Sequence, residues 1–210
     1  PRKNLIASSR TLRITNSGYG RIAQWQNEMP TSGSGSLSEA DRNRYARQLL
    51  IPGWGEDGQA LLKRSSVFIA GAGGLGSPLA LYLAVAGVGR LRLCDGDVVE
   101  LTNLNRQILH DDSRIGLQKA VSAQRTLRRT NPSVQVEALA TEIAEENVDQ
   151  LVGDSRIIVD CLDNFPTRYV LNRCAVRKHI PLVHAGIRGW DGNLTFLHPP
   201  ETPCLACIFP

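Results

Sequence analysis

Val67-Phe68-Ile69-Ala70-Gly71-Ala72-Gly73-Gly74-Leu75-Gly76 is the stretch that decides the fold of this 210-residue chain. Its first four residues form a short apolar run, which is typical of a strand buried in a parallel sheet. The next six fit the pattern G-x-G-x-x-G, and a stretch rich in Ala and Leu continues to Ala86. The glycines permit close approach of a phosphate, and the start of a helix offers free N–H groups. This strand, turn and helix predict a nucleotide site.

Strands and helices alternate after this turn. We expect strands at 91–94, 134–139, 157–160, 181–184 and 193–197, and helices at 119–129, 145–152 and 167–178. Helices of this length between strands predict an α/β fold, a Rossmann-like doubly wound, mostly parallel sheet with helices on both faces. Ligands of such sheets bind beyond the carboxyl ends of the strands. Two further helical stretches, from Ser38 through Leu50 and from Gly58 to Arg64, precede the first strand.

The composition, 42% hydrophobic and 21% charged, supplies enough apolar residues for a core. The formal charge of +4 originates in the first 27 residues, which hold five basic side chains and no acid. We therefore expect a flexible basic tail and linker over residues 1–36, a globular domain over residues 37–210, and no nucleic-acid surface on that domain. The tail fits either an organelle transit peptide or sequence that precedes a natural start at Met29.

The cysteines and the hydropathy of the chain bear on its location. No apolar run approaches the roughly 20 residues that cross a bilayer, and no secretory signal is evident. The five cysteines are an odd number spread along the chain. We expect a cytoplasmic protein that binds no membrane and keeps its cysteines reduced.

Several charged residues follow the predicted strands on the ligand side. Asp95 lies 19 residues after Gly76, at a strand end, where it can accept hydrogen bonds from ribose hydroxyls. Arg106 and Lys119 are cations suited to a polyphosphate, although a solvated surface position is the alternative for either one alone. Asp163 follows a further strand and suits either a Mg²⁺ ligand or the N-cap of the next helix.

The cysteines and the histidines indicate a function less specifically. Cys204 and Cys207 form a CxxC, which is half of a tetrahedral zinc site or else a buried or redox-active pair. The other cysteines are expected to be small buried residues inside strands or helices: Cys94, Cys161 and Cys174. The histidines show no spacing typical of a metal site or a catalytic triad, and each is expected in a polar or packing role: His110, His179, His184 and His198.

Seven motifs in a fixed order are more specific than any one of these features. They are Arg44-Tyr45-Ala46-Arg47-Gln48, Gly71 to Gly76, Asp95-x-Asp97, Asn103 to Gln107, Gly116-x-x-Lys119, Asp160-x-x-Asp163-Asn164 and Pro203-Cys204-x-x-Cys207. From about residue 37 to residue 210 the chain resembles the ThiF/MoeB/HesA superfamily, the bacterial relatives of ubiquitin-activating enzymes. By that resemblance the C-terminal part of the family fold is missing from this chain.

The resemblance implies an adenylyltransferase that uses ATP and Mg²⁺. Its substrate would be the C-terminal glycine carboxylate of a ubiquitin-fold sulfur-carrier protein of thiamine or molybdopterin synthesis, and its products the acyl-adenylate and pyrophosphate. Arg47 would act across a homodimer. A structural Zn²⁺ would need a second ligand pair besides the CxxC. The resemblance assigns the phosphate turn to Gly71, Gly73, Gly74 and Gly76, the ribose to Asp95, the phosphates to Asn103, Arg106 and Lys119, and Mg²⁺ to Asp163.

Two other functions remain open from the sequence. An NAD-dependent oxidoreductase would share the glycine turn, but four other residues would be left without a role: Arg47, Asn103, Arg106 and Lys119. A truncated chain that binds nucleotide but does not turn over is the second alternative. Release of pyrophosphate in the presence of ATP and a carrier separates adenylation from both.

Overall fold

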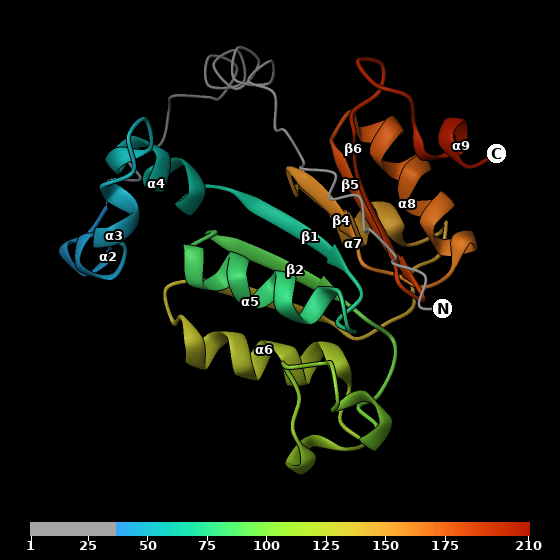
Figure 1. Ribbon diagram of the computed structural model, residues 1–210, viewed down its shortest axis with the longest axis horizontal. Helices are drawn as coiled ribbons and strands as arrows, with labels where there is room; N and C mark the ends of the chain where they lie inside the picture. The colour runs from blue at the N-terminus through green and yellow to red at the C-terminus, as the bar shows by residue number, and fades with distance from the viewer. Residues whose placement is uncertain (1–36) are drawn as a thin grey trace, which may run out of the picture. The chain divides into compact units, whose positions relative to one another are not determined.

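A computed structural model describes residues 37–210, and their strands form one six-stranded sheet (Figure 1). Neighbouring strands are parallel except β5 and β6, which form an antiparallel hairpin. This confirms the predicted Rossmann-like, mostly parallel sheet. The strands in spatial order are β3 (Gln135–Leu139), β2 (Arg90–Cys94), β1 (Ser66–Ala70), β4 (Ile157–Asp160), β5 (Leu182–Arg188) and β6 (Asp191–Leu197).

Helices cover both faces of the sheet, as Figure 1 shows. Helices α5 (Gly76–Ala86) and α6 (Lys119–Thr130) pack on one face, and α7 (Val148–Val152) and α8 (Phe165–Lys178) on the other. The residues of β1 alternate between the two layers, with Val67 and Ile69 in the α5–α6 core and Phe68 and Ala70 in the other. A strand buried on both faces explains the continuous apolar run of β1. The short helix α9 (Leu205–Ile208) contributes Leu205 to the α7–α8 core.

Several predicted boundaries were wrong. The first predicted helix is divided at Tyr45 into α2 (Glu39–Arg44) and α3 (Ala46–Leu49), and α4 (Gly55–Lys63) follows. The division has a packing reason: the Tyr45 ring is buried, its hydroxyl accepts a hydrogen bond from Asn131 Nδ2 at 2.8 Å, and Gly87 leaves room for it. Helix α7 begins at Val148, three residues after the predicted start. Strand β5 continues to Arg188, beyond its predicted end, because the hairpin with β6 extends it.

Other sequence predictions have mixed outcomes. Cys94 and Cys174 are buried, but Cys161 is only half-buried and lies after the end of β4, so its predicted place inside a strand or helix was wrong. In residues 37–210, no helix combines the length and the hydropathy needed to cross a bilayer. The expected basic tail and linker, residues 1–36, lies outside the described residues.

A buried carboxylate anchors the first helices. Asp41 is only 4% exposed, accepts hydrogen bonds from the N–H and hydroxyl of Ser38, and pairs with Lys63 Nζ at 2.5 Å. Burial alone would raise the pKa of Asp41, but the bonds from Lys63 and Ser38 outweigh it and lower this pKa from 3.8 to about 2. The carboxylate therefore stabilises the fold above about pH 4 and loses this effect as the pH falls towards 2.

We expect Asp41→Asn to lower the free energy of unfolding at pH 7 by about 2 kcal/mol, because the variant cannot carry the charge that Lys63 and Ser38 stabilise. The difference from the wild type should shrink as the pH falls from about 4 towards 2. Urea denaturation at several pH values measures both effects. Asp57→Asn, at an exposed position of α4, is the control and should cost far less. A loss that does not change with pH would contradict this assignment.

Candidate functional site

The candidate site lies where the order of the strands reverses. Strands β1 and β4 are adjacent and parallel, and Ala70 is paired with Asp160 at their carboxyl ends. The chain proceeds from β1 to β2 and β3 on one side, and from β4 to β5 and β6 on the other. Crevices at such a reversal are the usual ligand sites of open α/β sheets. The glycine turn follows β1 here, and the turn that carries Asp163 follows β4.

The backbone of the glycine turn packs so closely against neighbouring backbone that side chains at two of its positions would clash. Gly71 has a φ of +98°, and a Cβ added to it would lie 2.9 Å from the carbonyl oxygen of Cys161. A Cβ added to Gly76 would lie 1.9 Å from the carbonyl oxygen of Gly71. Glycine is therefore required at both positions, and the turn brings the start of α5 against the ends of β1 and β4.

The backbone of the turn presents free donors. No side chain caps α5, and the N–H groups of Gly73 and Gly74 donate to no acceptor within residues 37–210. Gly74 is exposed. Free amides at the start of an eleven-residue helix suit an anion, because the helix dipole adds a partial positive charge there.

Asp95 fastens the turn to the end of β2. Its Oδ2 accepts a hydrogen bond from Ala72 N at 2.7 Å, and its Oδ1 accepts one from Asp97 N at 2.9 Å. Two carboxylate oxygens offer about four lone-pair sites, so acceptors remain for ribose hydroxyls. The predicted ribose contact stays a prediction.

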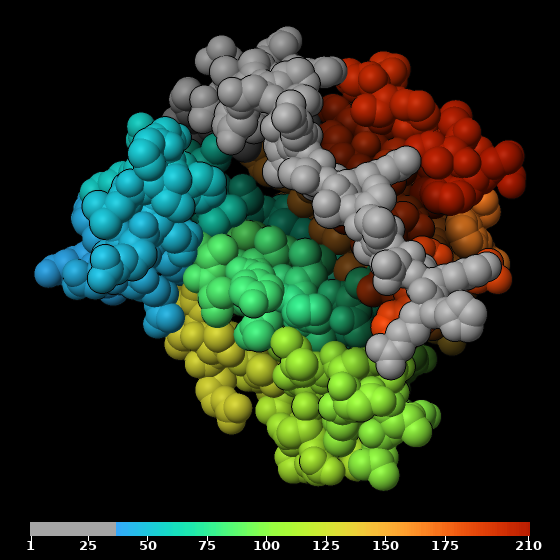
Figure 2. All heavy atoms as spheres, viewed as in Figure 1, coloured from blue at the N-terminus to red at the C-terminus, as the bar shows by residue number. Residues whose placement is uncertain are grey.

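Arg106 lies over the turn, next to Gly74. A Cβ added at Gly74 would be 3.5 Å from Arg106 Cδ and 3.6 Å from its Nε. Asn103 holds the short helical turn before Arg106, since its carbonyl oxygen accepts from Arg106 N and its Oδ1 accepts from Glu100 N. This structural role of Asn103 was missed, and its predicted contact with phosphate stays a prediction. The connection between β2 and α6, yellow-green in Figure 2, carries these residues beside the start of α5.

Lys119 begins α6 and is 93% buried, with a relative exposure of 7%. Its Nζ pairs with Asp97 Oδ2 at 2.8 Å. Because Asp97 N is bound to Asp95, and Asp95 to Ala72 N, a continuous set of contacts joins Lys119 to the glycine turn. Arg106 thus lies beside the turn, and Lys119 is joined to it through Asp97 and Asp95. The pairing of Lys119 with Asp97 was missed, and the predicted phosphate contacts of both cations stay predictions.

Asp163 lies two residues after Cys161, whose carbonyl oxygen borders Gly71. It is exposed, and its carboxylate has no hydrogen bond or ion pair within the described part of the chain. The alternative role as a helix cap belongs instead to Asn164, whose Oδ1 accepts from Thr167 N at 3.0 Å. A free carboxylate at this edge suits Mg²⁺ that also binds phosphate oxygens.

A buried ionic cluster, which the sequence analysis missed, supports the turn that carries Asp163. Asp160 is fully buried, and its Oδ2 lies 2.7 Å from His184 Nδ1 and 3.5 Å from Arg168 Nε. Its Oδ1 accepts from Leu162 N, and Arg168 donates to the Leu162 carbonyl. Both backbone groups of Leu162 are therefore fixed immediately before Asp163.

Arg47 lies away from the site of its own chain. It is exposed on α3, and the adjacent Gln48 donates from Nε2 to the carbonyl of Ala86, at the C-terminal end of α5. The glycine turn lies at the other end of this eleven-residue helix, roughly 16 Å away at 1.5 Å per residue. The expectation that Arg47 acts in the site of another protomer stays a prediction.

The cysteines differ in their chemistry. Burial raises the pKa of each of three thiols to about 12, which disfavours the nucleophilic thiolate: Cys94, Cys161 and Cys174. Burial would also raise the pKa of Cys204, but hydrogen bonds from Cys207 and Asn172 lower it. The sulfur atoms of Cys204 and Cys207 lie 3.4 Å apart, which fits two ligands of one metal. In residues 37–210, no cluster of three or more metal-ligating side chains is present.

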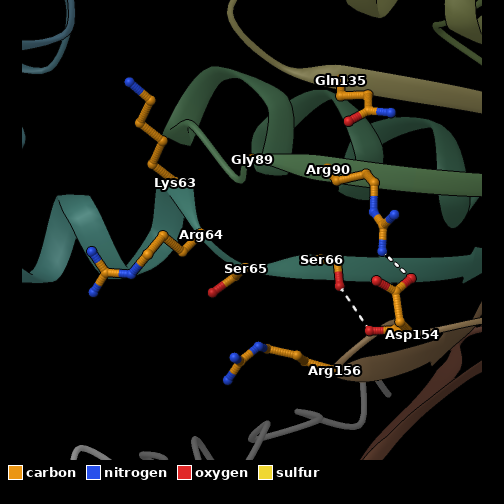
Figure 3. A pocket seen from close by; sticks show the side chains of 9 residues that line it. All are labelled: Lys63, Arg64, Ser65, Ser66, Gly89, Arg90, Gln135, Asp154 and Arg156. Atoms are coloured by element: carbon orange, nitrogen blue, oxygen red, sulfur yellow. Dashed lines mark hydrogen bonds and ion pairs between the residues drawn. The ribbon is translucent and has the colours of Figure 1, made fainter. Parts of the chain in front are cut away.

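A cavity of about 550 Å³ lies at the opposite end of the sheet (Figure 3). Several polar groups of its lining are paired within the protein: Arg90 pairs with Asp154 and Glu137, and Ser66 Oγ donates to the Asp154 carbonyl. It lies at the amino ends of the strands, whereas the free donors lie at their carboxyl ends. The cavity is therefore not part of the candidate site.

The sheet order and the helices on both faces define a Rossmann-like α/β protein. Residues 45–210 match the model of the ThiF family, and the chain belongs to that family. This confirms the resemblance found from the motifs.

Individual relatives support this membership. The chain is 43% identical over 182 residues to "Adenylyltransferase and sulfurtransferase MOCS3" of Xenopus laevis, covering 87% of this chain and 40% of that protein. It is 42% identical over 175 residues to "Protein HesA, vegetative" of Trichormus variabilis, covering 83% of this chain and 66% of that protein. The E. coli MccB structure with AMPCPP and MccA has a TM-score of 0.70 at 26% identity, covering 92% and 59%. The chain thus spans 40–66% of the length of these relatives.

We expect Gly76→Ala to destabilise the fold by about 3 kcal/mol or more, because the new methyl group would overlap the Gly71 carbonyl. Gly73→Ala is the matched control, since its nearest neighbour would lie 3.7 Å away, and it should change stability by less than about 1 kcal/mol. Denaturant titration of the two variants measures the difference. Equal stabilities would show that the turn is not packed as described.

Proposed function

We propose that this chain binds ATP and Mg²⁺ and adenylates the C-terminal glycine carboxylate of a ubiquitin-fold sulfur-carrier protein, with release of pyrophosphate. The observation that carries the proposal is the meeting of three features at one sheet edge: the free amides of the glycine turn, Arg106 and Lys119. Membership of the ThiF family supports it, and so does the word adenylyltransferase in the name of the MOCS3 relative.

The proposed reaction needs these cations for an electrostatic reason. A carboxylate oxygen attacks the α-phosphorus of ATP, the bond to the leaving pyrophosphate breaks, and negative charge moves onto pyrophosphate. Substrate carboxylate and triphosphate repel each other, so Arg106 and Lys119 would assist binding and then stabilise the charge that develops. Each well-placed cation is worth on the order of 10²-fold in rate. Mg²⁺ held by Asp163 would neutralise further phosphate charge.

Asp97 would act as the resting counter-ion of Lys119. Removing an unpaired ammonium group from water is costly, and the 2.8 Å pair with Asp97 avoids that cost when no nucleotide is bound. The Asp97 carboxylate is itself 75% exposed, so it can return to water when phosphate oxygens take its place. Lys119 would thus be oriented before ATP arrives.

The partner proposals extend this model. We propose a homodimer in which Arg47 of one protomer reaches the triphosphate of the other, because Arg47 lies far from its own glycine turn.

Cys204 and Cys207 would supply two thiolates to a structural Zn²⁺, which needs two further ligands. The five free cysteines favour a reducing compartment such as the cytoplasm. A thiamine or a molybdopterin carrier fits the proposal equally well.

Nucleotide binding without turnover is the second candidate, because the chain spans only 40–66% of the relatives' length. ATP–pyrophosphate exchange with this chain and a carrier tests the choice. Exchange supports adenylation, and ATP binding without exchange supports the second candidate. Binding of NAD in preference to ATP would overturn both.

We expect Asp163→Ala to reduce Mg²⁺-dependent pyrophosphate exchange by at least about 10²-fold and to leave the melting temperature within a few degrees, since no described residue pairs with this carboxylate. Asp57→Ala, an exposed carboxylate on α4, is the control and should retain full exchange. Unchanged exchange in Asp163→Ala would refute the proposed role.

Mixing two inactive variants tests the proposed action of Arg47 across the dimer. We expect Arg47→Ala and Asp163→Ala to be inactive separately and to regain about a quarter of wild-type exchange when mixed equally and allowed to exchange subunits. Half of the dimers would then be mixed, each with one intact site. No recovery in verified mixed dimers would show that Arg47 acts within its own chain or not at all.

A further inference from the structure

His110 lies under the glycine turn and has no part in the function proposed above. It is only 8% exposed, and it follows the segment that carries Arg106. Its Nε2 lies 3.2 Å from the carbonyl oxygen of Ala72, and its Nδ1 lies 2.9 Å from Ser122 Oγ. The imidazole therefore joins the turn to helix α6.

These contacts fix the hydrogens of the ring. A carbonyl oxygen can only accept, so Nε2 carries the proton and donates to Ala72. Nδ1 then accepts from the Ser122 hydroxyl. Burial lowers the pKa of His110, and the nearby charges of Lys119 and Arg114 act in the same direction, against Asp95 and the bond to Ala72. The ring is neutral at pH 7 in one tautomer.

Ala72 is held from both sides of its backbone. Its N–H donates to Asp95 Oδ2, and its carbonyl accepts from Ser77 Oγ at 2.9 Å as well as from His110. The following residues, Gly73 and Gly74, supply the free amides of the site. Any tilt of the Ala72 peptide would change the direction of those amides.

The other end of the bridge is equally fixed. Ser122 is fully buried in α6, one turn after Lys119. Arg114 Nη1 donates to the Ser122 carbonyl at 2.7 Å and to Thr126 Oγ1 at 2.6 Å, so the first turns of α6 are fastened to the same connecting segment. Residues three apart on a helix share a face, so Ser122 and Lys119 move together.

We propose that His110 is a positioning residue that sets the distance between the free amides of the glycine turn and Lys119, and so tunes the site for a triphosphate. This inference rests on the proposed function, because it assumes that phosphates bind at the turn. It assigns His110 no contact with substrate. Its expected effect is on phosphate binding and not on the nucleoside.

The test compares ATP and adenosine binding by calorimetry in His110→Leu and His110→Gln, in the natural full-length protein. His110→Leu removes the bond to Ala72, and we expect the affinity for ATP to fall about tenfold while that for adenosine changes less than about twofold. His110→Gln keeps an N–H donor and should recover ATP affinity to within about threefold of the wild type. His179→Asn, at an exposed position with φ +53° that asparagine tolerates, is the histidine control and should change neither affinity.

Ser122→Ala gives a second, smaller change in case His110→Leu fails to fold. It releases Nδ1 and lets the ring take the other tautomer, so we expect a few-fold loss of ATP affinity and none for adenosine. In the His110→Gln background the same substitution should add no further loss.

The outcomes separate the two hypotheses. A wild-type protein that binds no ATP overturns the proposed function and this inference together. A wild-type protein that binds ATP, with Ser122→Ala and any folded His110→Leu equally tight, overturns the inference alone. Equal losses for ATP and adenosine also overturn it, because they would show only a structural role for the imidazole.

Discussion

The close approach of Gly76 to the carbonyl of Gly71 is the constraint on which the rest of the site depends. It lets α5 begin close to the end of β1, and Leu75, which precedes the helix, makes no side-chain cap hydrogen bond. The amides of Gly73 and Gly74 are free as a consequence. Because β4 ends beside Gly71, the same approach brings the Asp163 turn to this edge. A larger residue at Gly76 would separate all of these groups.

The Lys119–Asp97 pair of the site differs from the buried Asp160 cluster in how its charges are balanced. Lys119 is buried and paired, yet its partner Asp97 is largely exposed, so the pair can open at modest cost. Asp160 is buried with two basic partners and has no such freedom. The first arrangement suits a group that exchanges partners with a ligand, and the second suits a group that holds a turn in place.

The fold was predictable from the sequence because its signals are local. The apolar run of β1, the glycine turn and the alternation of elements are each encoded by a few consecutive residues. The candidate site residues were proposed from the resemblance of the motifs to a known family. The side-chain network was not predictable. His110 and Ala72, or Asp160 and His184, are 38 and 24 residues apart and meet only through strand register and helix packing. The division of the first helix at Tyr45 likewise depends on the distant Asn131 and Gly87.

The two ends of the sheet differ in which of their charged groups and amides are paired. At the amino end, Arg90 pairs with Asp154, and Lys63 pairs with Asp41. At the carboxyl end, the amides of Gly73 and Gly74 and the carboxylate of Asp163 have no partner within residues 37–210. A sequence selected for stability alone gains by pairing such groups, as it does at the amino end. Unpaired donors of one sign beside a free carboxylate are what a metal-bound polyphosphate requires, and the proposed function rests on this arrangement at the carboxyl end as well as on the relatives.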